Sequence, residues 1–271
     1  MRWKIALAYI ILTGLTLFWI LPYYVAVATS FKTLKEVTEA KYLEPPTTLC
    51  IDAYIKALRE EGRGLLNSLI VSLPATFLSV LIGSLGGYFL ARFRFRGAQL
   101  IFFLVAVATF IPYQILLVPL VQVMGALGLM NTYAGLIVTY TVLFAPWAAL
   151  ISSAFFMAIP KELEEAAMLD GAGPLRTFFM IVLPVAAPGI VSTTIIVFTS
   201  VWNDFLFALT LSMSPEIRPV QPTLAALKGS FVAEWNTQMA GAVLASLPPL
   251  VIFLLLGRYF IKGLLAGALK T

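Results

Sequence analysis

The chain has 271 residues, of which 61% are hydrophobic and 11% charged, and its formal net charge is +5. Soluble domains are about 45–50% apolar and about 25% charged, so this composition excludes an ordinary soluble protein. The absence of histidine and the single cysteine, Cys50, exclude histidine-dependent catalysis, most zinc and haem sites, and an intrachain disulfide.

Long apolar stretches recur along the whole sequence. A helix needs about 20 apolar residues to cross a bilayer core of about 30 Å, and the alternating pattern of a membrane barrel is absent. The first apolar run is too long for a signal peptide and lacks a small-residue cleavage site. We expect an all-α, polytopic, single-domain membrane protein over residues 1–271. Its six transmembrane helices are predicted at about 5–29, 67–91, 98–121, 133–156, 186–211 and 239–261.

The polar residues 30–63 follow the first predicted span. They contain too few apolar residues for a domain, so we predict an extended loop with a short amphipathic surface helix at 52–59. In the next span, small residues permit close helix approach: Gly83, Gly86 and Gly87. In the third span, Pro112 and Pro119 predict kinks, because each proline removes a backbone hydrogen bond.

Six spans place both termini on the same side of the membrane. That side then carries ten basic and four acidic residues, and the other carries eight of each, with Asp204 left in the membrane. The positive-inside rule makes the terminal side cytoplasmic. The basic turn after the second span, which contains Arg92, Arg94 and Arg96, is interpreted as a topology anchor.

The longest charged interruption in the second half of the chain is the loop 160–184, between the fourth and fifth spans. Its acidic start favours a helix N-terminus, and Gly171 suits the C-terminal end of that helix. A second short helix is predicted from Pro174, with Pro184 ending it. Apolar stripes are expected on both helices, formed by Leu163, Ala166 and Ala167 and by Leu175, Phe178, Phe179 and Val182. A plain interfacial connector remains the alternative; a carboxylate active site lacks a nucleophile, a metal cluster or a phosphate-binding glycine loop.

Seven residues of this loop carry a family motif. Glu165-Ala166-Ala167, Gly171, Ile181 and Leu183-Pro184 stand at the spacing of the EAA motif, so the chain resembles permease subunits of binding-protein-dependent ABC importers. Further segments resemble the carbohydrate branch, and especially the six-span second permease of maltose-type transporters. These segments are NSLIVS at 67–72, ARFRFRG at 91–97, WNDFLFAL at 202–209 and GLLAGALK at 263–270.

The resemblance implies a function and a set of partners. The loop 160–184 would form coupling helices that dock on an ATPase subunit through Glu165, Ala166, Ala167, Asp170 and Gly171. The chain itself lacks the GxxxxGK[ST] phosphate loop, so it is not expected to be an enzyme or to hold a cofactor; ATP and Mg²⁺ would be bound by the partner. Expected partners are a second, usually different permease chain, two ATP-binding subunits, an extracytoplasmic solute-binding protein, membrane lipid and a sugar, but no nucleic acid. The expected location is the cell membrane of a prokaryote.

Two further segments are candidates for function. Trp202, Asn203 and Asp204 lie at membrane depth, where polar groups face a cavity or a partner; they either contact a sugar or hold helices together. The outer loop 212–238 resembles the loop that reaches into the binding protein in this family, or it only connects spans.

Other functions stay open as alternatives. A stand-alone secondary transporter or channel needs a chain of intramembrane ionisable residues, whereas only Asp204 is available, and inverted repeats are not evident. An intramembrane enzyme lacks paired carboxylates at membrane depth. An ABC permease for a solute other than a sugar is the remaining alternative.

Overall fold

The computed structural model describes residues 2–227 and 234–268, and within these residues its regular structure is entirely helical. Four helices are long and apolar enough to span a membrane, or six if each of two bent helix pairs counts as one span. The protein is therefore an all-helical, multi-pass membrane protein. In chain order the helices are α1 Arg2–Ser30, α2 Leu34–Thr38, α3 Asp52–Arg92, α4 Ala98–Phe110, α5 Leu117–Ala126, α6 Tyr133–Met157, α7 Lys161–Leu169, α8 Pro174–Thr177, α9 Leu183–Val185, α10 Ala187–Asn203, α11 Leu206–Leu211, α12 Val220–Ala226 and α13 Trp235–Ala268.

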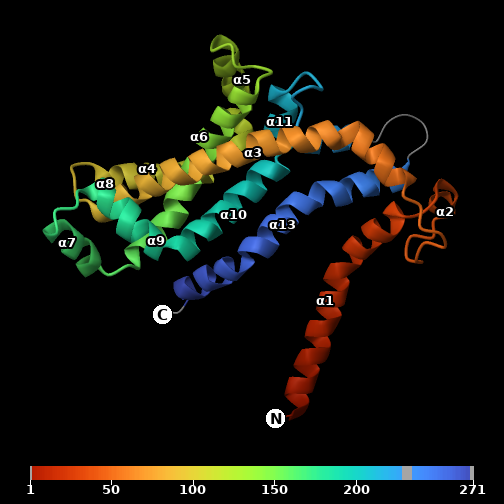
Figure 1. The fold of residues 1–271 in the computed structure, drawn as a ribbon, viewed down its shortest axis with the longest axis horizontal. Helices are drawn as coiled ribbons and strands as arrows, with labels where there is room; N and C mark the ends of the chain where they lie inside the picture. Colours follow the sequence, from red (N-terminus) through yellow and green to blue (C-terminus); the bar gives the residue numbers. More distant parts are fainter. Residues whose placement is uncertain (1, 228–233, 269–271) are drawn as a thin grey trace.

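The centre of the bundle is the close packing of α3 against α6 (Figure 1). A methyl group added at Gly83 would lie 2.5 Å from the carbonyl oxygen of Ala145, and one added at Gly87 would overlap Ala149. The expected close approach is thus made by two of the three glycines, whereas Gly86 faces open space. Small residues let the two backbones touch, which is how helices associate where lipid removes the hydrophobic driving force.

One sharp bend divides the predicted third span, and a second lies at the start of the predicted fifth span. The axis turns by 93° between α4 and the segment from Tyr113 to Ala126, at the site of Pro112, where a kink was expected. It turns by 84° at Ala186, between the segment Pro174–Val185 and α10. The predicted fifth span, 186–211, is also interrupted at Asp204, because α10 ends at Asn203 and α11 begins at Leu206.

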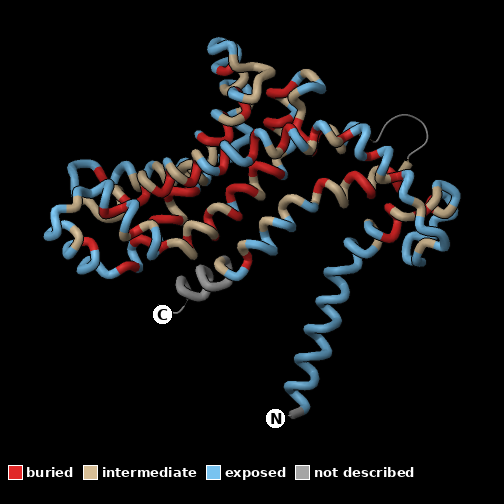
Figure 2. Tube along the Cα trace, in the orientation of Figure 1, coloured by how far each residue is buried: buried red, intermediate tan, exposed pale blue. Residues whose placement is uncertain are grey.

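The helix α1 projects away from the bundle (Figures 1 and 2). Its side chains are exposed from Trp3 to Tyr24, and burial begins only near Ala28, where the helix meets α13. Its exposed surface is apolar, so this surface belongs in contact with lipid or with another membrane helix.

One prediction for the loop 30–63 is wrong. Residues 52–59 do not form a separate surface helix, because they are the first turns of α3, which has 41 residues. At 1.5 Å per residue α3 is about 60 Å long, so it extends well beyond a bilayer core of about 30 Å. The helix α3 continues through Gly64. The missing side chain at this position leaves room for Thr223 of α12.

The remainder of the loop is ordered around Glu36, in α2. Thr33 and Glu36 form a reciprocal capping box at the start of α2. The Glu36 carboxylate also accepts hydrogen bonds from the hydroxyl and the backbone N–H of Thr47, at 2.6 and 2.8 Å. These bonds, followed by those from Thr33, stabilise the charged form and lower the pKa of Glu36 to about 2.

Candidate functional site: a two-helix loop and an aromatic hollow

The loop 160–184 forms two short helical segments, α7 and the run from α8 to α9, which gather at one end of the molecule (Figure 1). Gly171 has φ +84°, a left-handed conformation that ends α7. The amide of Ala172 donates to the carbonyl of Ala167 at 2.9 Å, and the amide of Gly171 donates to that of Met168 at 3.0 Å. This pair of bonds is a Schellman cap, as expected for glycine at this position.

The second segment changes its helical winding. After α8, residues Phe178–Val182 form one π-helical turn, and α9 continues to Val185 before the bend at Ala186. The segment therefore extends one residue past Pro184, to Val185. Of the expected stripe, Phe178 and Val182 are buried, whereas Leu175 and Phe179 are exposed. A π turn inside a helix is frequently found at functional sites.

The predicted coupling residues lie on the outer face of α7. Glu165, Ala166, Asp170 and Gly171 are exposed, and Ala167 is half-buried. Leu169, at the end of the same helix, is 88% exposed. The two segments enclose a shallow hollow of about 400 Å³, lined by Leu163, Ala166, Ala167, Asp170, Ala172, Arg176, Met180 and Ile181. An exposed apolar face bordered by carboxylates is a surface that can receive another protein.

The inner face of α7 carries a contact that the sequence reasoning missed. Glu164 is buried and pairs with Arg92, whose Nε lies 2.7 Å from Oε1 of the carboxylate. The hydroxyl of Tyr88 donates to Oε2 at 3.0 Å. Arg92 was interpreted only as a topology anchor, but its side chain is 6% exposed and holds α7. The four-residue spacing of Tyr88 and Arg92, which places both on one face of α3, was the available signal.

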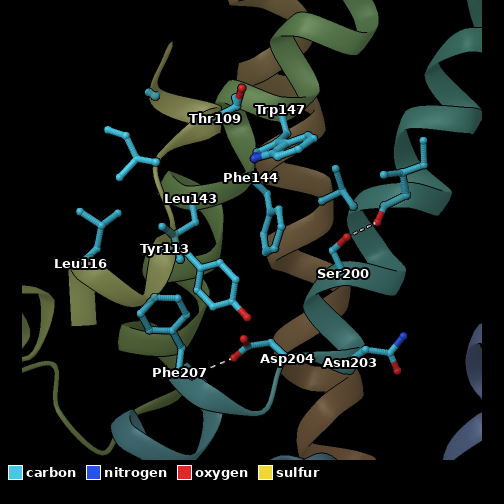
Figure 3. A pocket seen from close by; sticks show the side chains of 14 residues that line it. Thr109, Tyr113, Leu116, Leu143, Phe144, Trp147, Ser200, Asn203, Asp204 and Phe207 are labelled. Atoms are coloured by element: carbon cyan, nitrogen blue, oxygen red, sulfur yellow. Dashed lines mark hydrogen bonds between the residues drawn. The ribbon is translucent and has the colours of Figure 1, made fainter. Parts of the chain in front are cut away.

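A second candidate site is a hollow of about 360 Å³ beside the break between α10 and α11 (Figure 3). Asn203 and Asp204 line it, as the sequence suggested. Oδ1 of Asp204 accepts the hydroxyl of Tyr140 at 2.8 Å and the amides of Phe207 and Ala208 at 3.0 and 3.1 Å. The aspartate therefore caps α11 and ties it to α6, so its helix-joining role is present in the structure.

The structure does not bring Trp202 to this hollow. Its ring is 1% exposed, stacks on Phe198, and donates from Nε1 to the carbonyl of Ala245 at 3.0 Å, on α13. Other aromatic side chains line the hollow instead: Tyr113, Phe144 and Trp147 (Figure 3). Sequence reasoning missed them because they lie far from Asn203 and Asp204 in the sequence: Phe144 and Trp147 are on α6, and Tyr113 directly follows the bend after α4.

The first half of the outer loop 212–238 is hydrogen-bonded to α3. The side-chain amide of Asn67, on α3, donates to the carbonyls of Glu216 and Arg218 at 3.0 and 2.9 Å. The loop then continues into α12, which packs against α3. Residues 228–233 lie outside the described residues, and the predicted contact with a binding protein stays a prediction.

Comparison with known proteins identifies the class of protein that this fold represents. Residues 79–265 match the family described as "Binding-protein-dependent transport system inner membrane component". The chain belongs to this family and is a permease subunit of an ABC transport system, in which a separate subunit hydrolyses ATP. The resemblance drawn from the EAA motif is confirmed.

Individual relatives cover nearly the whole chain. The glucose import system permease protein of Saccharolobus solfataricus is 34% identical over 270 residues, covering 97% of this chain and 94% of the relative. The trehalose transport system permease protein SugB of Mycobacterium tuberculosis is 34% identical over 255 residues, covering 93% and 92%. A crystal structure of a bacterial ABC transporter involved in the import of the acidic polysaccharide alginate shares the fold, with a TM-score of 0.82, 22% identity, and coverage of 96% and 97%.

Within residues 2–227 and 234–268, no group of three or more His, Cys, Asp or Glu side chains is placed to hold a metal ion.

Proposed function

We propose that this chain is the permease of an importer for a sugar or oligosaccharide, that it forms half of the translocation pathway, and that α7 to α9 dock on the ATPase. The observation that carries the proposal is the exposed outer face of α7, with Glu165 and Leu169 open to a partner. The proposed assembly holds a second permease, two ATP-binding subunits and an extracytoplasmic binding protein. The domain comprises residues 1–271.

The orientation follows from charge. With both termini cytoplasmic, the loop 160–184 lies on the side that carries ten basic and four acidic residues, and ATP is available there. Closure of two ATPases would draw the coupling helices together. A rigid-body movement of the attached spans would then alternate the access to the pathway.

The hollow beside Asp204 supports a sugar as the solute. Its lining combines aromatic side chains with the polar residues Thr109, Ser200 and Asp204, and Asn203 lies at its edge (Figure 3). Oδ1 of Asp204 is already bonded to Tyr140 and to the start of α11, so it orients rather than binds. Asn203 is exposed at the edge of the hollow, where its side-chain oxygen accepts a hydrogen bond from Gln221 at 3.3 Å, and its side-chain amide is a second candidate for a contact with a sugar hydroxyl. Related permeases carry names that refer to glucose and trehalose, which favours this class of solute.

The docking proposal is tested by co-purification. Glu165→Lys should release the ATPase from the purified complex, because it reverses a charge on the outer face of α7. Glu44→Lys, which changes an exposed glutamate of the 30–51 loop, should retain the ATPase. Retention of the ATPase by the Glu165→Lys protein, or ATP-independent transport by the single chain, contradicts the proposal.

The solute is identified by calorimetry of the cognate binding protein against a panel of sugars, with amino acids and peptides as the comparison. Binding of a sugar supports the proposed class of solute. Binding of an amino acid or peptide alone would leave an ABC permease for a different solute.

A further inference from the structure

The last turn of α3 contacts three oxygen atoms, two on the buried face of α7 and one directly before this helix. Both oxygens of Glu164 are engaged, one by Arg92 at 2.7 Å and the other by Tyr88 at 3.0 Å. Arg92 also donates to the backbone carbonyl of Ile159, directly before the turn that begins α7. The last turn of α3 therefore contacts both the body of α7 and the backbone that precedes it.

An ion pair is a costly way to fill this space. Both side chains are more than nine-tenths buried, and removing two charges from water offsets much of their attraction. Apolar side chains of similar size would bury the same surface at a lower cost. The ion pair differs from them in requiring one relative position of the two helices, because a rotation or a slide of α7 against α3 would leave a buried charge without its partner.

The second coupling segment reaches the same place. The ring of Phe178, in the π turn, lies 5.1 Å from the ring of Tyr88, and both rings pack on Phe156 of α6. All three side chains are fully buried. Tyr88 thus contacts α7 through its hydroxyl and the π turn through its ring.

We propose that Glu164, Arg92 and Tyr88 are positioning residues that transmit a displacement of α7 to α3. The chain itself connects the coupling loop only to α6 and α10, so this cluster is a third, non-covalent connection. The inference rests on the proposed function, since it requires that an ATPase moves α7. It adds that the movement enters the long helix at the centre of the bundle directly.

The test removes both charges together, so that no unpaired charge is left buried. The double variant Arg92→Met with Glu164→Leu is compared with Arg94→Met, which removes an exposed charge two residues away. Each is built on Cys50→Ser with Ser200→Cys, which places a thiol in the hollow beside Asp204. Purified complexes with the ATPase are labelled with a maleimide, without nucleotide and after trapping with Mg-ATP and vanadate.

In the parent and in the Arg94→Met complex, trapping should change the labelling rate at least fivefold. In the double variant, with the ATPase retained, the change should be less than twofold. A change in the double variant as large as in the parent overturns the inference and shows a purely structural ion pair. No change in the parent refutes the proposed function, and with it the inference.

If the double variant loses the ATPase, a milder variant tests whether the cluster transmits the displacement of α7 to α3. Tyr88→Phe removes one hydrogen bond to Glu164 and keeps the ring contacts. Its response to trapping should fall about two- to threefold below that of the parent. An unchanged response would overturn the inference.

Discussion

We expect that glycine is needed at position 171 only because the backbone there is left-handed, since there is room for a side chain. Its φ is +84°, and a methyl group built on it meets no atom within 4 Å. A residue with a side chain pays about 1–2 kcal/mol in the left-handed region. Replacing glycine by alanine also restricts the unfolded chain, which returns about 0.4–1 kcal/mol. Gly171→Ala should therefore destabilise the turn by roughly 1 kcal/mol.

Gly173 provides a matched control, two residues away. It too has no neighbour within 4 Å of an added methyl group, but its φ is −69°, which alanine adopts without strain. Gly173→Ala should be neutral or slightly stabilising. The difference between the two variants isolates the strain, about 1–2 kcal/mol, or roughly a 5- to 30-fold change in the population of the closed turn.

Hydrogen exchange in the purified complex measures this difference. The amides at positions 171 and 172 close the turn, so they report its opening directly. Faster exchange in Gly171→Ala than in Gly173→Ala is the expected result. If protection is equal in the two variants, within about 0.5 kcal/mol, backbone strain is not the reason for glycine at position 171.

Three other predictions concern packing and charge. Gly83→Val should destabilise the protein by about 1–3 kcal/mol, because the Cβ of the new side chain would lie 2.5 Å from the carbonyl oxygen of Ala145. A lower unfolding temperature in detergent would show this loss. Trp202→Phe should cost about 1–3 kcal/mol, because the carbonyl of Ala245 loses a buried donor, yet leave the KM for uptake unchanged. Glu36 has a pKa lowered from 4.5 to about 2, so its stabilisation is complete above pH 4.5 and is lost as the pH falls toward 2. Protection factors of the loop amides, which are corrected for the intrinsic pH dependence of exchange, should show this loss, and Glu36→Gln should abolish the pH dependence of the protection factors.

Apolar length and composition, which the bilayer sets, indicated the long continuous helices, whereas the expected spans 98–121 and 186–211 are each broken in the structure. The helix α6 covers the expected span 133–156 almost residue for residue, and α13 contains 239–261. The prediction failed at 52–59, where an amphipathic pattern indicated a helix but did not show that it continues. Gly64 lies inside this helix, where its missing side chain makes room for Thr223 of α12.

Side-chain direction was the information that the sequence did not hold. Glu164 and Glu165 are adjacent acids on one helix, and only the placement of α7 on α3 makes the first a buried partner of Arg92. In the same way, Trp202 and Asp204 are close neighbours in the sequence, but the first packs against α13 and the second lies at the hollow. A count of basic residues per loop, which sets topology, cannot show which of them is paired.

Two positions of α3 contact segments on opposite sides of the bundle, and this makes the helix a candidate lever. At its C-terminal end Arg92 holds α7, and within the helix the side-chain amide of Asn67 holds the outer loop through the carbonyls of Glu216 and Arg218. These two residues are separated by 25 positions of one unbroken helix, or about 37 Å at 1.5 Å per residue. A tilt of α3 imposed by α7 would therefore move the outer loop in the same step, and no further joint between them is required.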